Sequence, residues 1–382
     1  NDTFRMNDGA TLLGTINGGG GMNLLDYSNY KTSVSIDLIE GMATGISSLN
    51  SIQNIYGGSA NDSLYGNNGE NIIKGNGGND ILSGIDGDDT YLFTDGFGVD
   101  QITESTGMDT LDFSEVSTTL TFSLASSNVI NDVFNRVTYN GNLMERLIGG
   151  SADDIFYFAD GFALPEFGWI NGSDGSDWLN YNAYTTGIAV NLSTGAATGV
   201  VDGVVYIENV IGGFGNDSIT GSSVNNILRG GDGSDSLTGL EGDDTLEGGT
   251  GNDAYLFSGN AWGNDTLNDI SGTDTLDFTL ASDALSFHLG TASLTVSGGV
   301  NNLNVTSGNN IERLLGGTGN DIFIFANGAN LAGGGTGTYL SCGSGNNTLD
   351  YNAYTGGVYV NLLTGTATGI NNTLPGGIDH IQ

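Results

Sequence analysis

Residues 230–256 read GGDGSDSLTGLEGDDTLEGGTGNDAYL, which is three nine-residue units in succession. Each unit begins with Gly, carries Asp at its sixth position and has an apolar residue at its eighth. Glycine permits a positive φ and a tight reversal, whereas three residues with a central apolar side chain fit a short extended strand. The stretch therefore predicts alternating turns and short strands, with the eighth residue of each unit facing a core.

The nine-residue register holds without a slip over two blocks, residues 57–92 and 212–256. Two units make one coil, so the apolar eighth residues are expected to form continuous inward ladders. Burying each one stabilises the fold by about 1.5–3 kcal/mol. Ordering the backbone costs about 1–2 kcal/mol per residue over nine residues, so the turns need another source of stability. The ladder residues are Leu64, Ile73, Leu82, Tyr91, Ile219, Leu228, Leu237, Leu246 and Tyr255.

The segments between the blocks favour the same all-β class. Alternating runs such as TLTFSL (119–124) and LSFHL (285–289) have the period of half-buried strands. No segment has a sustained helical period, and 66 Gly in 382 residues disfavour helix interiors. We predict an all-β chain.

The composition is extremely acidic. Seven Lys and Arg against 44 Asp and Glu give a formal net charge of -37, which argues against binding nucleic acid or anionic membranes through a basic patch. No apolar run approaches the ~18 residues of a membrane span. Cations are the natural partners, while 37% hydrophobic residues argue for a folded chain rather than a solvated tail.

The turns supply the ligands for such a cation. Stacked coils bring the carboxylate at position 6 and several backbone carbonyls of one turn against those of the turn 18 residues later. Ligation by oxygen alone suits Ca²⁺ better than Zn²⁺ or Cu²⁺, and the irregular, carbonyl-rich turn suits Ca²⁺ better than Mg²⁺. The sequence therefore predicts several bound Ca²⁺ ions.

The units GGFGNDSIT, GGDGSDSLT and GGTGNDAYL closely fit the GGxGxDxUx nonapeptide, and the chain resembles the RTX (repeats-in-toxin) family. The resemblance implies a right-handed parallel β-roll with Ca²⁺ between its coils, in a protein exported by type I secretion and folded outside the cell. It also implies ligand pairs 18 residues apart: Asp62 with Asp80, Asp217 with Asp235, and Asp235 with Asp253.

The opposite edge of each block departs from the family pattern, because Asp89 and Asp244 are matched by Asn71 and Asn226. An amide oxygen ligates Ca²⁺ without bringing charge, so weaker sites are expected there. Position 6 of three isolated units holds Asp154, Asp177 and Asp321, without a partner turn visible in the sequence. For those isolated units, a metal site and a plain Asx turn are equal alternatives.

A longer period divides the chain into modules. LDYSNY (25–30), LNYNAY (179–184) and LDYNAY (349–354) recur, and matched motifs lie roughly 155 to 170 residues apart. We predict module A at 1–153 with block 57–92, module B at 154–320 with block 212–256, and a truncated module C at 321–382. Residues 1–4 (NDTF) match the end of GGTGNDIF, so the sequence is expected to be a window on a longer repetitive protein.

Catalysis is not expected. The two histidines, His288 and His380, lie in no HExxH motif, and no GxSxG motif occurs. The single Cys342 cannot form an internal disulfide and is expected to be a free surface thiol.

Two functions fit these observations. The first is a calcium-dependent structural segment of an extracellular filament, surface layer or adhesin stalk, which binds other copies of the same chain. The second is a calcium-folding export module of a toxin or secreted hydrolase. Recurrence of the long module favours the first function.

Overall fold

The computed structural model describes residues 1–125, 127–140, 144–306, 310–331, 338–361, 366–368 and 370. No α-helix occurs in these residues, and none of the segments they form could cross a membrane as a helix. The chain divides into two compact units, the first of residues 1–180 and 196–207, the second of residues 181–195 and 208–382.

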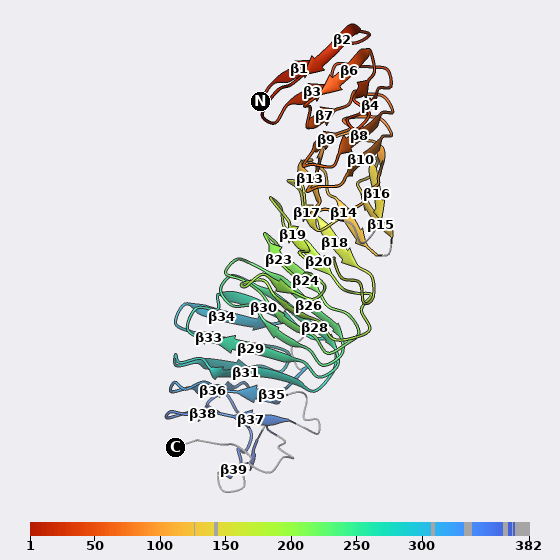
Figure 1. Ribbon diagram of the computed structural model, residues 1–382. Coiled ribbons are helices and arrows are strands. Elements are labelled where there is room, and N and C mark those ends of the chain that lie inside the picture. Colours follow the sequence, from red (N-terminus) through yellow and green to blue (C-terminus); the bar gives the residue numbers. More distant parts are fainter. Residues whose placement is uncertain are drawn as a thin grey trace. The chain divides into compact units, whose positions relative to one another are not determined.

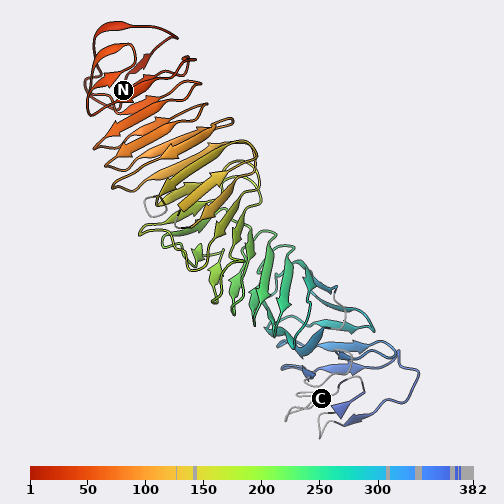
Figure 2. The same cartoon turned by 90° about the vertical axis from the view of Figure 1, so that its right-hand side faces the viewer.

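In the first unit, successive strands alternate between two mainly parallel sheets, and Figure 2 shows these strands stacked one above another in the red-to-yellow part of the chain. One sheet contains β1 (Thr3–Arg5), β3 (Leu24–Asp26), β7 (Asn54–Tyr56), β9 (Ile72–Lys74), β11 (Thr90–Thr94), β13 (Thr110–Glu115), β17 (Arg146–Ile148), β19 (Trp169–Asn171) and β23 (Gly203–Val205). The facing strands are β2 (Leu12–Asn17), β4 (Ser35–Asp37), β5 (Met42–Ala43), β6 (Ile46–Asn50), β8 (Ser63–Asn67), β10 (Ile81–Ile85), β12 (Val99–Ile102), β14 (Thr121–Leu124), β15 (Ser127–Asn131), β16 (Arg136–Asn140), β18 (Ile155–Phe158) and β20 (Trp178–Asn180). The first unit also contains β22 (Ala196–Ala197).

The second unit repeats this arrangement (Figure 1). One sheet contains β21 (Ala189–Asn191), β25 (Ser218–Thr220), β27 (Ser236–Thr238), β29 (Ala254–Ser258), β31 (Asp274–Leu280), β35 (Ile311–Leu315) and β37 (Tyr339–Ser341). The facing strands are β24 (Asn209–Ile211), β26 (Ile227–Asp232), β28 (Thr245–Thr250), β30 (Asn264–Asn268), β32 (Ser286–Leu289), β33 (Leu294–Gly298), β34 (Asn301–Val305), β36 (Ile322–Phe325) and β38 (Thr348–Asp350). A separate antiparallel pair is β39 (Val360–Asn361) with β40 (Thr366–Ala367).

The nonapeptide strands pair in parallel and in the register that the sequence predicts. Leu64 lies beside Leu82, and Ile219 beside Leu237, in strands one coil apart. All nine predicted ladder residues are fully buried. The all-β parallel β-roll is therefore confirmed, with two nonapeptides in each coil.

After each block the coil grows wider and an aromatic stack is added beside the inward ladder, which continues with Leu111 next to Tyr91 and Leu276 next to Tyr255. Phe93 and Phe113 stack at a centroid distance of 4.3 Å in the first unit, and Phe257 and Phe278 at 4.6 Å in the second. Each unit then inserts an antiparallel three-stranded segment, β14–β15–β16 or β32–β33–β34. The two units therefore present the same elements in the same order.

The alternation of inward and outward side chains along a strand also explains why Cys342 is buried. It directly follows β37, in which Leu340 points inward and Ser341 does not, so Cys342 is the next inward residue and is buried. The expected surface thiol is wrong, because two-residue periodicity at the end of a strand outweighs the polar sequence around it. The module boundaries at 153/154 and 320/321 stay a prediction, and module C includes residues 332–337, 362–365, 369 and 371–382, which lie outside the described residues.

Candidate metal centres

The aspartates at position 6 form hydrogen-bonded ladders across neighbouring coils. In the second unit, the amide of Asp217 donates to Asp235 Oδ1 at 2.7 Å, and the amide of Asp235 donates to Asp253 Oδ1 at 2.8 Å. In the first unit, the amide of Asp62 donates to Asp80 Oδ1 at 2.8 Å. The three pairs predicted 18 residues apart are therefore in direct contact.

The opposite edges are built in the same way. The amide of Asn71 donates to Asp89 Oδ1 at 2.7 Å, and that of Asn226 donates to Asp244 Oδ1 at 2.8 Å. Each asparagine uses its own side-chain NH₂ as well: Asn71 Nδ2 donates to the carbonyl of Gln53, and Asn226 Nδ2 to that of Glu208. Asn71 and Asn226 are thus the first residues of their ladders, and the side-chain NH₂ group of each donates to a backbone carbonyl.

The isolated units also acquire partners that the sequence did not reveal. The amide of Asp154 donates to Asp177 Oδ1 at 2.7 Å, although 23 residues separate them. The amide of Asp321 donates to Asn347 Oδ1 at 2.8 Å. Asp154, Asp177 and Asp321 are all completely buried.

The turns that carry a position-6 aspartate are of two kinds, which differ in whether the second carboxylate oxygen, Oδ2, accepts a hydrogen bond. In the first kind, which we call closed turns, this oxygen accepts the amide of the residue at position 2 of the same unit. The acceptors are Asp62, Asp154, Asp217 and Asp321, with the amides of Gly58, Gly150, Gly213 and Gly317 as donors.

In the second kind, the open turns, Oδ2 is buried and accepts no hydrogen bond. Within the nonapeptide blocks the open turns belong to Asp80, Asp89, Asp235, Asp244 and Asp253. The position-2 residue of an open turn has a positive φ, as in Gly231 (113°) and Gly249 (110°), which turns its amide away from the carboxylate. Asn76, Ile85 and Leu240 take the same left-handed conformation without being glycine.

The open carboxylate faces a backbone carbonyl of the next coil. A methyl group built on Gly230 would lie 2.2 Å from Asp235 Oδ2 and 2.6 Å from the carbonyl oxygen of Gly248. The first glycine of each unit is therefore required, because any larger residue would fill the space on which these oxygens converge. A buried carboxylate oxygen and a carbonyl oxygen around one small space fit a hard cation.

Burial is the main electrostatic effect on these groups. It raises the pKa of Asp80, Asp89 and Asp235 to about 7, and that of Asp154, Asp244 and Asp253 to about 6. Burial also raises the pKa of Asp62 and Asp217, but their two backbone amides oppose it. Burial therefore favours a cation or a proton at the closed Asp154 turn as well as at the open turns.

Sequence reasoning missed the acidic residues that continue each ladder beyond its block. The amide of Asp80 donates to Asp100 Oδ1, and the amide of Asp244 to Asp265 Oδ1, over 20 and 21 residues. A Gly-x-Asp tripeptide, the end of a nonapeptide turn, was the available signal. It occurs at 98–100, 107–109, 263–265 and 272–274. The ladders of Asp109 and Asp274 then end at Glu145 and Glu312, whose carboxylates accept the aspartate amides at 2.8 Å.

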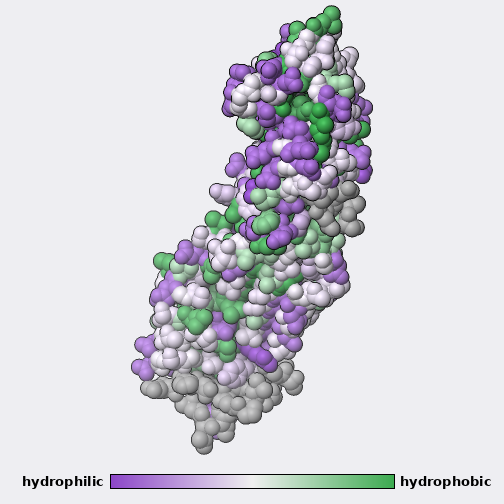
Figure 3. All heavy atoms as spheres, viewed as in Figure 1, coloured by the Kyte–Doolittle hydropathy of each residue, from purple (hydrophilic) through white to green (hydrophobic). Residues whose placement is uncertain are grey.

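Glu145 and Glu312 thus end the carboxylate ladders of the two units. Of the two histidines, His288 is exposed and contacts the Ser286 hydroxyl, while His380 lies outside the described residues. On the face seen in Figure 3, hydrophilic residues are interspersed with hydrophobic ones, whereas the position-6 aspartates of the blocks are at most 3% exposed.

Comparisons with known proteins agree with this geometry. Residues 56–91, 202–223 and 220–255 match the family model "RTX calcium-binding nonapeptide repeat (4 copies)", and residues 265–362 match "Peptidase M10 serralysin C terminal". No curated protein matches the chain. Among solved structures, the extracellular lipase LipA from Serratia marcescens matches with 17% identity and a TM-score of 0.21, over 65% of this chain and 38% of the lipase chain. The chain thus spans well under half of the lipase's length.

Proposed function

Because this chain carries RTX calcium-binding nonapeptide repeats and binds Ca²⁺ at several sites through them, we propose that it is a calcium-dependent structural segment of a large secreted repetitive protein. The repeats and the serralysin C-terminal match are non-catalytic parts of secreted, extracellular proteins. An extracellular filament, a surface layer or an adhesin stalk is the setting we propose.

One observation carries the structural role: the two units repeat the same long series of elements. Each has a nonapeptide block, a stacked pair of aromatic rings and an antiparallel three-stranded insertion. An export module needs only the nonapeptides, whereas a segment that provides length gains from repeating the whole series. Other copies of the same chain are the partners we propose, held by calcium between their acidic turns.

The residues proposed to hold calcium are the position-6 aspartates with an open carboxylate oxygen. In closed turns Asp62, Asp154, Asp217 and Asp321 would contribute less, and Asn71 and Asn226 least. Asp177 belongs with the ligands because it continues the ladder from Asp154. The calcium would supply positive charge between stacked carboxylates, and the chain's own amides would hold each carboxylate in place.

Circular dichroism with chelator and then with millimolar CaCl₂ tests the calcium requirement, since extracellular modules bind with Kd values of about 10⁻⁴ to 10⁻³ M. We expect a disordered spectrum that becomes β-rich, and an unchanged spectrum would contradict the proposal. Electron microscopy in calcium tests the structural role: filaments support it.

The alternative function is a calcium-folding export or stabilising module of an RTX toxin or secreted hydrolase. The match of residues 265–362 to the serralysin C terminal favours it. Dispersed monomers in calcium, together with an activity attached to the full-length protein, would support this alternative and overturn the structural role.

A further inference from the structure

Each nonapeptide block ends on a tyrosine where the earlier units have Leu or Ile. Tyr91 and Tyr255 are fully buried, and their hydroxyls accept the amides of Gly84 at 2.6 Å and Gly248 at 2.8 Å. In earlier units the same amide donates to a backbone carbonyl of the next coil, as Gly212 does to Arg229 at 2.7 Å. The tyrosine hydroxyl thus replaces a carbonyl at the point where the coil widens.

Each hydroxyl also donates to an acidic side chain from outside the nonapeptides. Tyr91 donates to Glu104 Oε1, and Tyr255 donates to Asp269 Oδ2. Glu104 and Asp269 occupy matching places in the two units, five residues before Asp109 and Asp274 respectively. The hydroxyl therefore fixes a third carboxylate beside the last turn of each block.

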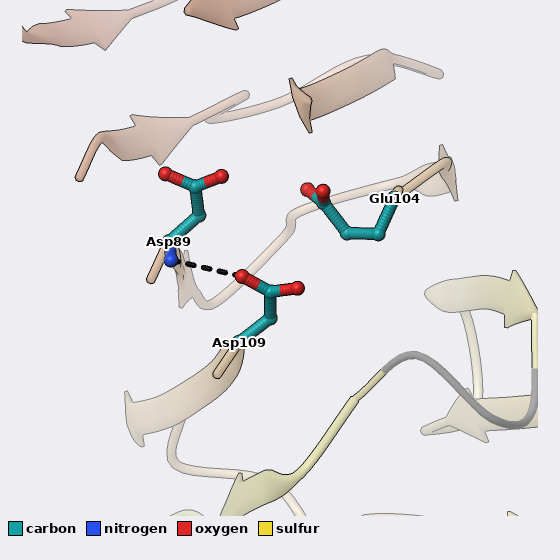
Figure 4. Close-up of side chains that lie close together, drawn as sticks. All are labelled: Asp89, Glu104 and Asp109. Carbon is teal, nitrogen blue, oxygen red and sulfur yellow. Dashed lines mark hydrogen bonds between the residues drawn. The ribbon is translucent and has the colours of Figure 1, made fainter. Parts of the chain in front are cut away.

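These contacts assemble two clusters of three carboxylates. Asp89, Glu104 and Asp109 have oxygens that all lie within 4.8 Å of one another, and so do Asp253, Asp269 and Asp274. Figure 4 shows the Glu104 carboxylate pointing toward Asp89, and Asp109 accepting the Asp89 amide. Neither cluster contains a nitrogen or sulfur ligand.

An unpartnered oxygen points to a ligand in both clusters. Asp89 Oδ2 is buried without a hydrogen bond, in a residue with no exposed surface. Asp253 Oδ2 is in the same state, in a residue that is 1% exposed. Three neighbouring carboxylates repel one another unless a positive charge lies between them.

We propose that each cluster binds one Ca²⁺ and closes its block, as a site that takes one carboxylate from the last open turn and two from residues outside the nonapeptides. A regular open turn offers its carboxylate oxygen and the glycine carbonyl of the next coil. Here Glu104 or Asp269 stands beside that carboxylate, so the ion meets three carboxylates. Calcium affinity rises with the number of charged ligands, so these two sites fill first as calcium increases.

The test counts bound Ca²⁺ by native mass spectrometry of the whole chain in wild-type and variant proteins. Glu104→Gln and Asp269→Asn each lose one ion and the double variant loses two, while Glu104→Asp restores the ion lost in Glu104→Gln. Glu40→Gln and Asp202→Asn are controls at exposed acidic residues. Variants that stay β-rich in calcium and bind as many ions as the wild type overturn the proposal.

A second measurement does not require those variants to fold. Terbium replaces calcium, and its emission is excited through tyrosine in the wild type and in Tyr91→Phe/Tyr255→Phe. Because each hydroxyl contacts a ligand carboxylate, this double variant loses more emission than Tyr206→Phe/Tyr359→Phe, which removes two exposed tyrosines of the chain's 15. Equal losses overturn the proposal. This inference rests on the proposed function only in that the chain binds calcium. If the wild type binds no calcium at all, the proposed function is refuted instead.

Discussion

Replacing Asp235 by Asn and, separately, Asp217 by Asn tests the distinction between open and closed turns. Both aspartates are buried in the same ladder, one coil apart. Asp235 has an Oδ2 without a hydrogen bond, whereas Asp217 Oδ1 and Oδ2 accept the amides of Ile188 at 2.9 Å and Gly213 at 2.8 Å. Asp235→Asn should therefore remove a calcium site, whereas Asn at position 217 has one acceptor oxygen and leaves one of these two backbone amides without its acceptor.

The expected free energies of unfolding differ in their dependence on calcium. Loss of one site removes about 1.4 kcal/mol at a calcium concentration ten times its Kd, and about 2.7 kcal/mol at one hundred times Kd. A hydrogen bond to a charged group contributes about 1.5–3 kcal/mol against about 0.5–1.5 kcal/mol for a neutral one. Asp217→Asn should cost about 1–3 kcal/mol at every calcium concentration, because one buried backbone amide loses its acceptor.

Urea unfolding followed by circular dichroism, at several calcium concentrations that keep the wild type folded, measures both variants. The difference between Asp235→Asn and the wild type should grow with calcium, while that of Asp217→Asn should stay constant. If the difference for Asp217→Asn also grows, or that for Asp235→Asn is constant, the assignment of calcium to open turns is refuted.

Three further predictions concern strain, the end of the block and pH. Leu240→Asn should stabilise the fold by about 0.5–1 kcal/mol in urea unfolding, because Leu240 has a φ of 75° that Asn tolerates better. Ser222→Asn, at the same position of the Asn226 turn but without a positive φ, should bring no gain. Tyr255→Phe should cost about 1–3 kcal/mol in the same assay, because it leaves the buried amide of Gly248 without its acceptor. In chelator, the unfolding free energy should fall between about pH 4 and pH 8, because burial raises the pKa of Asp100 to about 8 in the fold and the folded state then binds the proton more tightly. Circular dichroism showing more β-structure at pH 8 than at pH 5 would contradict this sign.

The sequence predicts the coil because its period and its chemistry agree. One apolar residue every nine places Leu64 over Leu82, and the spacing of 18 brings Asp62 against Asp80. Both depend only on a constant coil length, which an uninterrupted register guarantees. The same reasoning fails at Glu104, because the coil lengthens to 20 residues after the block and a period cannot give the length of an insertion.

Open and closed turns could not be separated by sequence for a different reason. Gly58 and Gly213 occupy position 2 of closed turns without a positive φ, while Ile85 and Leu240 adopt one in open turns. Glycine permits the left-handed conformation but does not impose it. The choice depends on whether a preceding turn is already stacked below, which is a property of the coil's neighbours.

The hydrogen-bonded ladder makes the calcium sites dependent on one another. Each aspartate receives an amide from the preceding coil and gives its own amide to the following carboxylate, as Asp217, Asp235 and Asp253 do. A cation at one open turn fixes that carboxylate and thereby orients the amide that holds its neighbour. Without cations, the ladder would stack like charges at a coil spacing of about 4.8 Å, and every added coil would increase the repulsion. Occupancy should consequently spread along a block from its most negative site, so folding of the block and filling of its sites are one cooperative process.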